Sequence, residues 1–413
     1  MNWAGNYTYS SSPVHVAHSI EEAQALVKKY PHLKVLGTRH CFNNIADSND
    51  QLISLAPLNT ILPVDKNNHT VTVEAGVRYG ELATVLQAQG YALHNLASLP
   101  HISVVGGCAT ATHGSGISNA NLSAAVQAIS FISASGDMVQ LSRQEHAAVF
   151  PGAVVHLGGL GVVTGITLAV HPAWRMQQYV YQNLPMQQLA NHFEEIMSAG
   201  YSVSLFTGWR NKNIDEVWIK KKEGKAPPAV FFGATAATQH LHPIRHMPAQ
   251  NCTEQMGVAG PWHERLPHFR MGFTPSSGAE LQSEYFVPLN SAWEAIQAVE
   301  RLHEKIAPHV LISEIRCIAA DDLWMSPCYR QACAAIHFTW QPNWPAVRAL
   351  LPLVEEALAP FDAKPHWGKL FTASPQRISG LYEKLPAFRQ LLESYDPQAK
   401  FRNEYLDTVI FGG

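Results

Sequence analysis

Short apolar runs and amphipathic runs alternate along the first 172 residues of the chain. Ser19 and Glu22 have the spacing of a capping box, which predicts a helix that ends at Tyr30. A second helix is predicted over residues 81–89, where Gly90 closes it. Apolar and β-branched runs bounded by turn residues predict strands at 33–36, 52–55, 70–73, 128–133 and 138–141.

Turn residues between these runs predict how the strands pair. The turn at 65–68 is expected to join the strands on either side of it as a hairpin, and so is the turn at 135–137. The glycine-rich residues 152–170 are interpreted as two short strands and a turn. Because strands and helices alternate without the regular βαβ order of a doubly wound sheet, the pattern favours an α+β fold.

The pattern changes near Pro172, where charged residues return, tryptophans become frequent and loops lengthen. Residues 240–285 show no clear periodicity, helices are expected over 291–305 and 345–358, and one interrupted helix is expected over 376–392. A chain of 413 residues is long enough for two domains. The predicted divisions are a first domain at 1–172, a second domain built on a mixed sheet at 173–370, and a C-terminal segment at 371–413.

Composition narrows the class of protein. Hydrophobic residues make up 46% of the chain, enough for a large core, which excludes disordered and fibrous proteins. The net charge of −3 provides no electrostatic basis for binding nucleic acid or an anionic membrane. The N-terminal residues lack the basic and apolar segments of a signal peptide, and the six cysteines include no CxxC pair. We therefore expect a reduced, cytoplasmic protein.

The 55 residues from Leu82 to Gly136 contain no Asp, Glu, Lys or Arg. Polar residues and glycines interrupt this stretch throughout, so it is not a membrane span. Within it, residues 98–114 are rich in small side chains, as are 35–41 and 158–165. Small residues let a ligand approach the backbone, whose N–H groups can bind an anion such as a diphosphate. Tight turns between core strands would have the same composition, so both interpretations stay open.

Three other patterns lack a required feature. Residues 159–164 have two glycines of a Rossmann turn but neither the third glycine nor a following helix. The two histidines of 263–268 are five residues apart rather than the four of a metalloprotease helix, and a proline interrupts them. The three histidines of 240–246 have no carboxylate or thiolate at ligand spacing, so no metal site is expected.

Three glycine-bearing segments together resemble the PCMH-type FAD-binding domain of the vanillyl-alcohol oxidase superfamily. They are the Gly37–His40 turn, residues 98–114 and residues 161–164. Further segments along the whole chain are similar to those of bacterial alditol oxidases: 2–6, 201–207, 261–269, 314–316, 337–340 and 365–369. The resemblance implies an FAD-binding domain, a cap domain that binds the substrate, and a C-terminal segment that returns to the FAD-binding domain.

The resemblance also implies roles for individual residues. His40 would bind FAD covalently, although Arg39 and Cys41 flank it where many relatives carry Gly and Ser. The other residues implied to contact FAD are Val35, Leu36, Gly37, Thr38, Arg39, Cys41, Ser98, Ser103, Gly106, Gly107, Thr110, Thr112, His113, Gly114, Gly161, Val163 and Ile166. The implied catalytic residues are Arg316, Lys369 and Glu314. The implied substrate-binding residues are Ser98, Glu314, Arg316, Thr339, Lys369 and His337.

The spacing of these residues is compatible with a shared site. On a strand, residues two apart face the same side, which applies to Glu314 with Arg316 and to His337 with Thr339. His366 is expected to lie behind the substrate-contacting residues.

The resemblance implies oxidation of the terminal primary alcohol (C1) of alditols such as xylitol or sorbitol to the aldose. O₂ would be reduced to hydrogen peroxide, and a cation at Arg316 or Lys369 would stabilise the developing oxyanion. The expected partners are the polyol and O₂, without nucleic acid or membrane, and the expected state is a monomer. Three alternatives remain: an aldonolactone oxidoreductase, a polyol dehydrogenase with another acceptor, and a flavin-free carbohydrate-binding protein.

Overall fold

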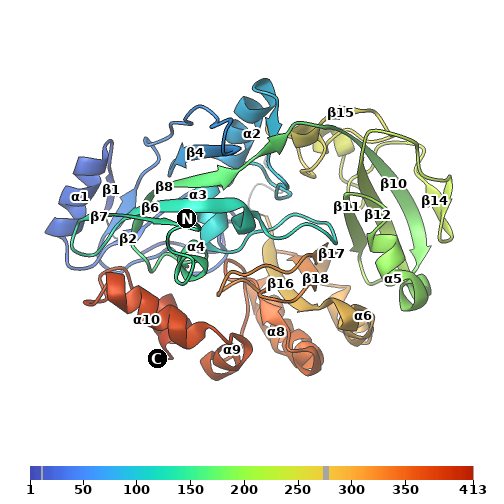
Figure 1. The fold of residues 1–413 in the computed structure, drawn as a ribbon. Coiled ribbons are helices and arrows are strands. Elements are labelled where there is room, and N and C mark those ends of the chain that lie inside the picture. The colour runs from blue at the N-terminus through green and yellow to red at the C-terminus, as the bar shows by residue number, and fades with distance from the viewer. Residues whose placement is uncertain (11–12, 273–278, 413) are drawn as a thin grey trace.

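The computed structural model describes residues 1–10, 13–272 and 279–412. The chain forms two sheet-containing halves that lie side by side, and the C-terminal helices lie against the first half (Figure 1). In the described part of the chain, none of the helices has the length and apolar character needed to cross a membrane.

Among its described residues, the first half contains two main sheets and four α-helices. A parallel sheet has the order β1 (Val14–Val16), β3 (Leu52–Ser54) and β2 (Lys34–Val35). An antiparallel sheet has the order β4 (Thr70–Glu74), β8 (Val162–Ala169), β6 (Val126–Ile132) and β7 (Met138–Ser142). The short strands β5 (Tyr91–Ala92) and β9 (His171–Pro172) pair with each other. The helices are α1 (Ile20–Lys29), α2 (Tyr79–Ala88), α3 (Val104–Ala109) and α4 (Phe150–Val154).

In this half, predictions of local structure are confirmed more often than predictions of which strands pair. The Ser19 side chain accepts a hydrogen bond from the N–H of Glu22 and caps α1, and β6 pairs with β7 as the expected hairpin. The hairpin expected around 65–68 is wrong, because β3 pairs with β1 and β2 whereas β4 pairs with β8. The start of 152–170 is the end of α4 rather than a strand, and Pro151 lies in the first turn of that helix.

Among the described residues, the second half is built on a ten-stranded sheet. Its strands, in order, are β13 (Val230–Phe231), β14 (Ala234–Ala236), β10 (Arg175–Pro185), β12 (Asn213–Lys222), β11 (Ser202–Thr207), β17 (Val310–Ile318), β18 (Cys333–Trp340), β16 (Leu281–Pro288) and β19 (Lys364–Pro365), with β15 (Gly260–Pro261) paired to β10. Where a mixed sheet was expected, these strands pair antiparallel.

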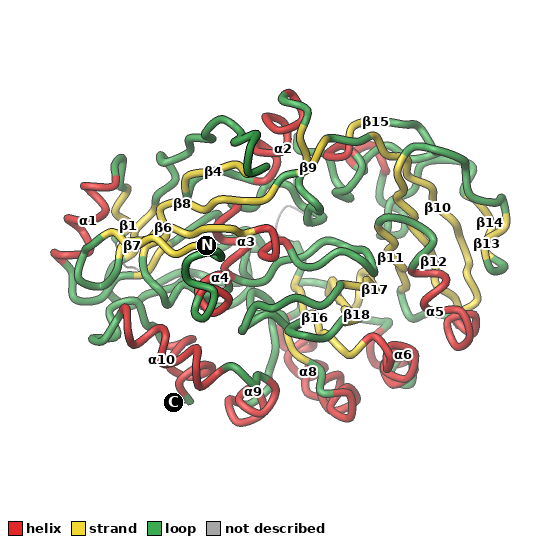
Figure 2. The backbone as a smooth tube through the Cα atoms, in the orientation of Figure 1, coloured by secondary structure: helices red, strands yellow, loops and turns green. Residues whose placement is uncertain are grey.

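Helices cover one face of this sheet. They are α5 (Leu189–Met197), α6 (Ala292–Glu300), α7 (His303–Ile306) and α8 (Trp344–Leu358), which share one buried core with the sheet. Figure 2 shows α5, α6 and α8 together on one side of the strands. The other face of the sheet is therefore available to form a site.

The C-terminal segment packs against the first half of the molecule. It contains α9 (Pro375–Leu381) and α10 (Leu385–Tyr395), followed by a π-helical turn at Leu406–Phe411. The single interrupted helix expected here is thus two helices, and Pro386 stands in the first turn of the second. Phe388 and Leu406 are fully buried in the same core as β4, β6 and β8.

Candidate active site

A cavity of about 560 Å³ lies between the two halves. The first half contributes Gly37, His40 and Gly106 to its wall, and the second half contributes Glu314 and Lys369. The volume is within the usual range of small-molecule and cofactor sites, roughly 300–1,000 Å³. The cavity is therefore the natural place to look for the predicted chemistry.

Strand register brings three ionisable side chains into one row across the sheet. Glu284 on β16 pairs with His337 on β18, which in turn pairs with Glu314 on β17. Arg316 and Thr339, each two residues further along its strand, project from the same face. The intervening residues face the opposite way and pack against the helices. Three alternating strands thus place a polar row on the cavity side.

Glu284 is the centre of the ion pairs at this site. Its side chain is fully buried, and its oxygens lie 3.1 Å from Arg316 Nη2, 2.7 Å from Lys369 Nζ and 3.3 Å from His113 Nε2. Burial alone would raise the pKa of Glu284, but Lys369, His113 and Arg316 outweigh it and hold that pKa well below the ordinary value. Glu284 is thus a carboxylate that joins two cations.

Sequence reasoning did not identify Glu284. The signal that could have found it is the alternation along β16, in which Gln282 and Glu284 stand between the buried Leu281, Ser283 and Tyr285. Both polar residues line the cavity.

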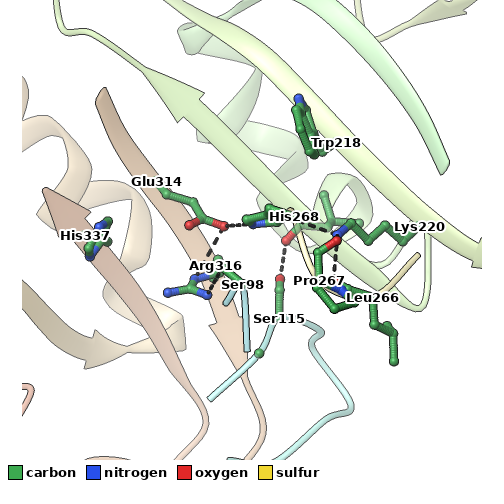
Figure 3. A network of polar contacts seen from close by, with 12 residues as sticks. Ser98, Ser115, Trp218, Lys220, Leu266, Pro267, His268, Glu314, Arg316 and His337 are labelled. Carbon is green, nitrogen blue, oxygen red and sulfur yellow. Dashed lines mark hydrogen bonds and ion pairs between the residues drawn. The ribbon is translucent and has the colours of Figure 1, made fainter. Parts of the chain in front are cut away.

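Glu314 and Arg316 meet residues from two other segments of the chain (Figure 3). Arg316 Nη1 donates to Ser98 Oγ at 3.3 Å, and Arg316 Nε lies 3.5 Å from Glu314 Oε1. The same oxygen of Glu314 lies 2.7 Å from His268 Nε2. Burial opposes both charges, but Arg316 and His268 lower the pKa of Glu314, and the two glutamates, Glu314 and Glu284, raise the pKa of Arg316. The pair therefore stays charged.

Lys369 links Glu284 to His337 and Thr339. Lys369 Nζ lies 2.8 Å from His337 Nδ1, and His337 Nε2 lies 3.0 Å from Thr339 Oγ1. Burial, followed by the charge of Lys369, lowers the pKa of His337 to about 3. The neutral ring thus accepts at Nδ1 and donates from Nε2. Burial also lowers the pKa of Lys369, although Glu284 opposes this shift.

His40 stands in the cavity wall beside the glycine-rich segments. Both of its ring nitrogens are buried and have no hydrogen-bond partner among the described residues. Its ring stacks on Trp3 with 5.7 Å between centroids. Burial, and then His101, lowers the pKa of His40 to about 4, so the imidazole is neutral. A neutral imidazole with an unused lone pair is a competent nucleophile.

Two glycines of α3 lie in close contact with their surroundings. A Cβ atom at Gly106 would lie 2.7 Å from Ser103 Oγ, and one at Gly107 would lie 3.0 Å from the ring of Tyr79. Thr110 donates to the Gly106 carbonyl, and its hydroxyl lies beside that of a second threonine in the cavity wall. Backbone and hydroxyl groups, rather than charged side chains, therefore form this part of the wall.

The structure brings most of the predicted site residues together. Those lining the cavity are Val35, Leu36, Gly37, Thr38, Arg39, His40, Cys41, Ser98, Ser103, Gly106, Gly107, Thr110, Thr112, His113, Gly161, Val163, Glu314, Arg316, His337, Thr339 and Lys369. Gly114 and Ile166 lie outside this lining. A Cβ at Gly114 would meet Asn95 Oδ1 at 2.5 Å, and Ile166 is buried in the core of the first half. Close packing against the Asn95 loop explains Gly114, and core packing of β8 explains Ile166.

His113, Glu284 and His366 have ligand-type atoms within 4.8 Å of one another. Arg316 and Lys369 already neutralise Glu284, so a divalent cation there would meet two positive side chains. We interpret this group as part of the ion-pair network.

Comparison with known proteins identifies the family. A model described as FAD binding domain matches residues 12–142, and one described as D-arabinono-1,4-lactone oxidase matches residues 278–409. An alditol oxidase from a Streptomyces species is 45% identical, with 100% of this chain and 99% of the relative covered. The chain belongs to the alditol oxidase family.

Two more distant proteins match this chain over nearly its full length. The L-gulonolactone oxidase of Scyliorhinus torazame is 24% identical over 99% of this chain and 98% of the relative. The crystal structure of cholesterol oxidase from B. sterolicum superposes with a TM-score of 0.80 at 14% identity, covering 99% of this chain and 96% of that one. The expected α+β fold with an FAD-binding domain is thereby confirmed.

The residues of this alditol oxidase family member fit FAD. The segment matched as an FAD-binding domain contains His40, whose ring nitrogens lack partners, and the glycines of α3, where a Cβ would be crowded. A diphosphate can be bound by backbone N–H groups without positive side chains. The uncharged stretch from Leu82 to Gly136 supplies such a surface to the cavity.

Proposed function

We propose that this enzyme oxidises the terminal primary alcohol (C1) of an alditol such as xylitol or sorbitol to the aldose, with O₂ reduced to hydrogen peroxide. The observation that carries the proposal is that Glu314, Arg316, Thr339 and Lys369 line the same cavity as His40. An open-chain polyol has a hydroxyl on every carbon, and this row of donors and acceptors suits several of them at once. The 45% identity to an alditol oxidase supports the same substrate class.

The charge of each side chain determines its proposed role in binding the substrate. FAD bound in the cavity would supply the acceptor for the two electrons and the hydrogen that leave C1. Glu314, a carboxylate, accepts hydrogen bonds from substrate hydroxyls, and Ser98 and Thr339 orient further hydroxyls. Arg316 stays charged because the two neighbouring glutamates raise its pKa, so it stabilises negative charge that develops on the substrate oxygen.

Lys369 is the group best suited to take the hydroxyl proton. Glu284 and Glu314 hold lowered pKa values and His337 a pKa of about 3, so all three are weak bases. Burial lowers the pKa of Lys369 below its ordinary value, so its neutral form is more accessible than that of an exposed lysine. The proton would pass from the substrate O–H to Lys369 Nζ, leaving an ammonium beside the oxygen that has lost it.

Finer features of the enzyme follow from the same reasoning. His40 would attach FAD covalently through the flavin 8α-methyl carbon, and its unpartnered ring nitrogens support this assignment. The six cysteines, all in the described part of the chain, are free thiols, which supports a reducing compartment such as the cytoplasm. We expect the protein to act as a monomer.

The test is the product formed under air. Purified flavoprotein incubated with xylitol or sorbitol should release hydrogen peroxide, measured by a peroxidase-coupled assay together with oxygen uptake. Arg316→Ala should lower turnover by about a hundredfold at unchanged flavin content. The exposed Arg301 provides the matched control, and Arg301→Ala should leave turnover unchanged. Absence of peroxide with both polyols would contradict the proposal.

One observation favours a second candidate function. The match to the D-arabinono-1,4-lactone oxidase model covers residues 278–409, which include Glu314, Arg316 and Lys369. A higher kcat/KM for galactono-lactone than for xylitol would identify a cyclic lactone, rather than an open-chain polyol, as the substrate. Flavin bleaching by xylitol without oxygen, combined with no peroxide in air, would instead indicate a dehydrogenase.

A further inference from the structure

Lys220 is a buried amine that the proposed reaction does not use, and burial lowers its pKa to about 7, so it is an ammonium below that pH. It lies on β12 and is 1% exposed. Its Nζ donates to the carbonyls of Leu266 and Pro267 at 2.6 and 2.8 Å and lies 3.0 Å from His268 Nδ1 (Figure 3). An ammonium group has three donors. All three are therefore used on a single loop, residues 266–268.

Glu314 and Lys220 together fix the tautomer of His268. A carboxylate has no hydrogen to donate, so the hydrogen of His268 is on Nε2, and Nδ1 is the acceptor that faces Lys220 Nζ. Nε2 lies 2.7 Å from Glu314 Oε1 and therefore donates to it. The rings of Phe206 and Trp218 pack edge-on against the imidazole at 5.5 and 5.3 Å and restrict its rotation. His268 is thus a rigid donor aimed at one oxygen of Glu314.

The same loop also holds the first half of the molecule. The N–H of His268 donates to the carbonyl of Ser98 at 3.2 Å. The hydroxyl of Ser98 in turn accepts from Arg316 at 3.3 Å. His268 therefore sets the position of Ser98 through its backbone and that of Glu314 through its side chain. Two predicted substrate-binding residues from different halves depend on one loop.

We propose that Lys220 and His268 are positioning residues that keep Glu314 available to a substrate hydroxyl. His268 occupies Oε1 of Glu314 and leaves Oε2 for the polyol. Without this contact, Glu314 would be free to turn both oxygens toward Arg316, because a bidentate carboxylate–guanidinium pair is the stronger arrangement. The acceptor would then be lost from the cavity. This inference rests on the alditol oxidase function proposed above.

Steady-state kinetics of the holoenzyme separate this role from a merely structural one. Lys220→Met and His268→Phe should each raise the KM for xylitol about tenfold or more while kcat falls less than about threefold, since a hydrogen bond to a charged group contributes more than one between neutral groups. Neither variant should change KM much further in a Glu314→Gln background. Lys222→Met is the matched control, because Lys222 is exposed on the same strand and contacts the Trp174 ring instead.

A second readout does not depend on activity. Side-chain nitrogen NMR of histidine-labelled protein should show His268, assigned by its loss in His268→Phe, with hydrogen on Nε2 only. Lys220→Met should shift the Nδ1 resonance of His268, because this acceptor nitrogen loses the Lys220 amine, while the hydrogen stays on Nε2 opposite Glu314. If Lys220→Met loses flavin or unfolds, His268→Phe decides, because it leaves both carbonyl contacts of Lys220 intact.

The outcomes distinguish the two proposals. A wild-type enzyme that oxidises no polyol contradicts the proposed function, and the Nδ1 resonance of His268 in Lys220→Met then tests the contact with Lys220 by itself. A wild-type enzyme that oxidises xylitol, with unchanged KM in both variants or with effects that add fully to Glu314→Gln, would overturn the positioning role.

Discussion

Glu284 and Lys369 form an ion pair of 2.7 Å in which the carboxylate side chain is fully buried. The same carboxylate lies 3.1 Å from Arg316, so one acid holds two cations next to each other at the cavity. Arg316 is proposed to stabilise negative charge on the substrate oxygen, and Lys369 is proposed to take the proton that this oxygen loses. Their proximity is stable only while Glu284 compensates their charge, which makes this acid as important to the site as the residues that contact substrate.

Glu284→Gln should therefore damage both activity and stability. Removing one member of a buried ion pair costs roughly 3–5 kcal/mol because the remaining charge is uncompensated. We expect a lower melting temperature and a kcat/KM for xylitol reduced by at least about tenfold. Glu294→Gln, at an exposed position of α6, is the control and should match the wild type in both measurements. An unaltered melting temperature in Glu284→Gln would argue against the ion-pair network.

The pH dependence of turnover should report on Lys369. Neutral Lys369 is proposed as the base, so kcat should rise as pH rises through its pKa, which burial holds below 10.5. Glu284 raises that pKa, so the rising limb should move to lower pH in Glu284→Gln. Lys369→Met should lack the limb altogether. A limb that persists unchanged in Lys369→Met would assign the proton transfer to another group.

Flavin attachment provides an independent test of His40. His40→Ala should yield protein whose acid precipitate is colourless, because the covalent bond to FAD can no longer form. His18→Ala, at an exposed position, should give a yellow precipitate like the wild type. A yellow precipitate from His40→Ala would place the linkage on another side chain.

The fold was predictable from the sequence where structure is decided locally. Ser19 caps its helix through a contact three residues away, and β6 and β7 are joined by a short turn. The partner of β4 was not predictable, because alternation specifies a buried face but not the strand that covers it. The turn at 65–68 is real, with Asp65 bridged to Thr70, yet the strand before it belongs to another sheet.

The candidate site follows the same division. Glu314 and Arg316 were placed together because residues two apart on a strand share a face, and they do so on β17. Glu284 was not found, because it reaches the site through the pairing of β16 with β18, which joins residues 53 positions apart, Glu284 and His337. Lys220 was missed for the same reason, since its partners lie on a distant loop.

Buried neutral histidines should make the protein sensitive to acid. The pKa values of four of them are lowered to about 4 or about 3, mainly by burial: His40, His156, His268 and His337. An unfolded histidine has a pKa near 6.5, so below that pH the unfolded chain binds more protons than the native state. The stability from these groups is complete above about pH 6.5 and is lost as pH falls toward 4.

Two buried acids have the opposite effect on the pH dependence of stability, but they are fewer than the four histidines. Burial raises the pKa of Glu216 to about 7 and that of Asp321 to about 6, so each stabilises the native state at low pH and less as pH rises. Below pH 6.5, each of these histidines lowers the free energy of unfolding by about 1.4 kcal/mol per pH unit of acidification. The four histidines therefore outweigh the two acids. The melting temperature should therefore fall between pH 6.5 and 5. His156→Asn, which removes one titrating group, should reduce this slope, whereas His18→Asn at an exposed position should not. A melting temperature that rises on acidification would show that the buried acids dominate.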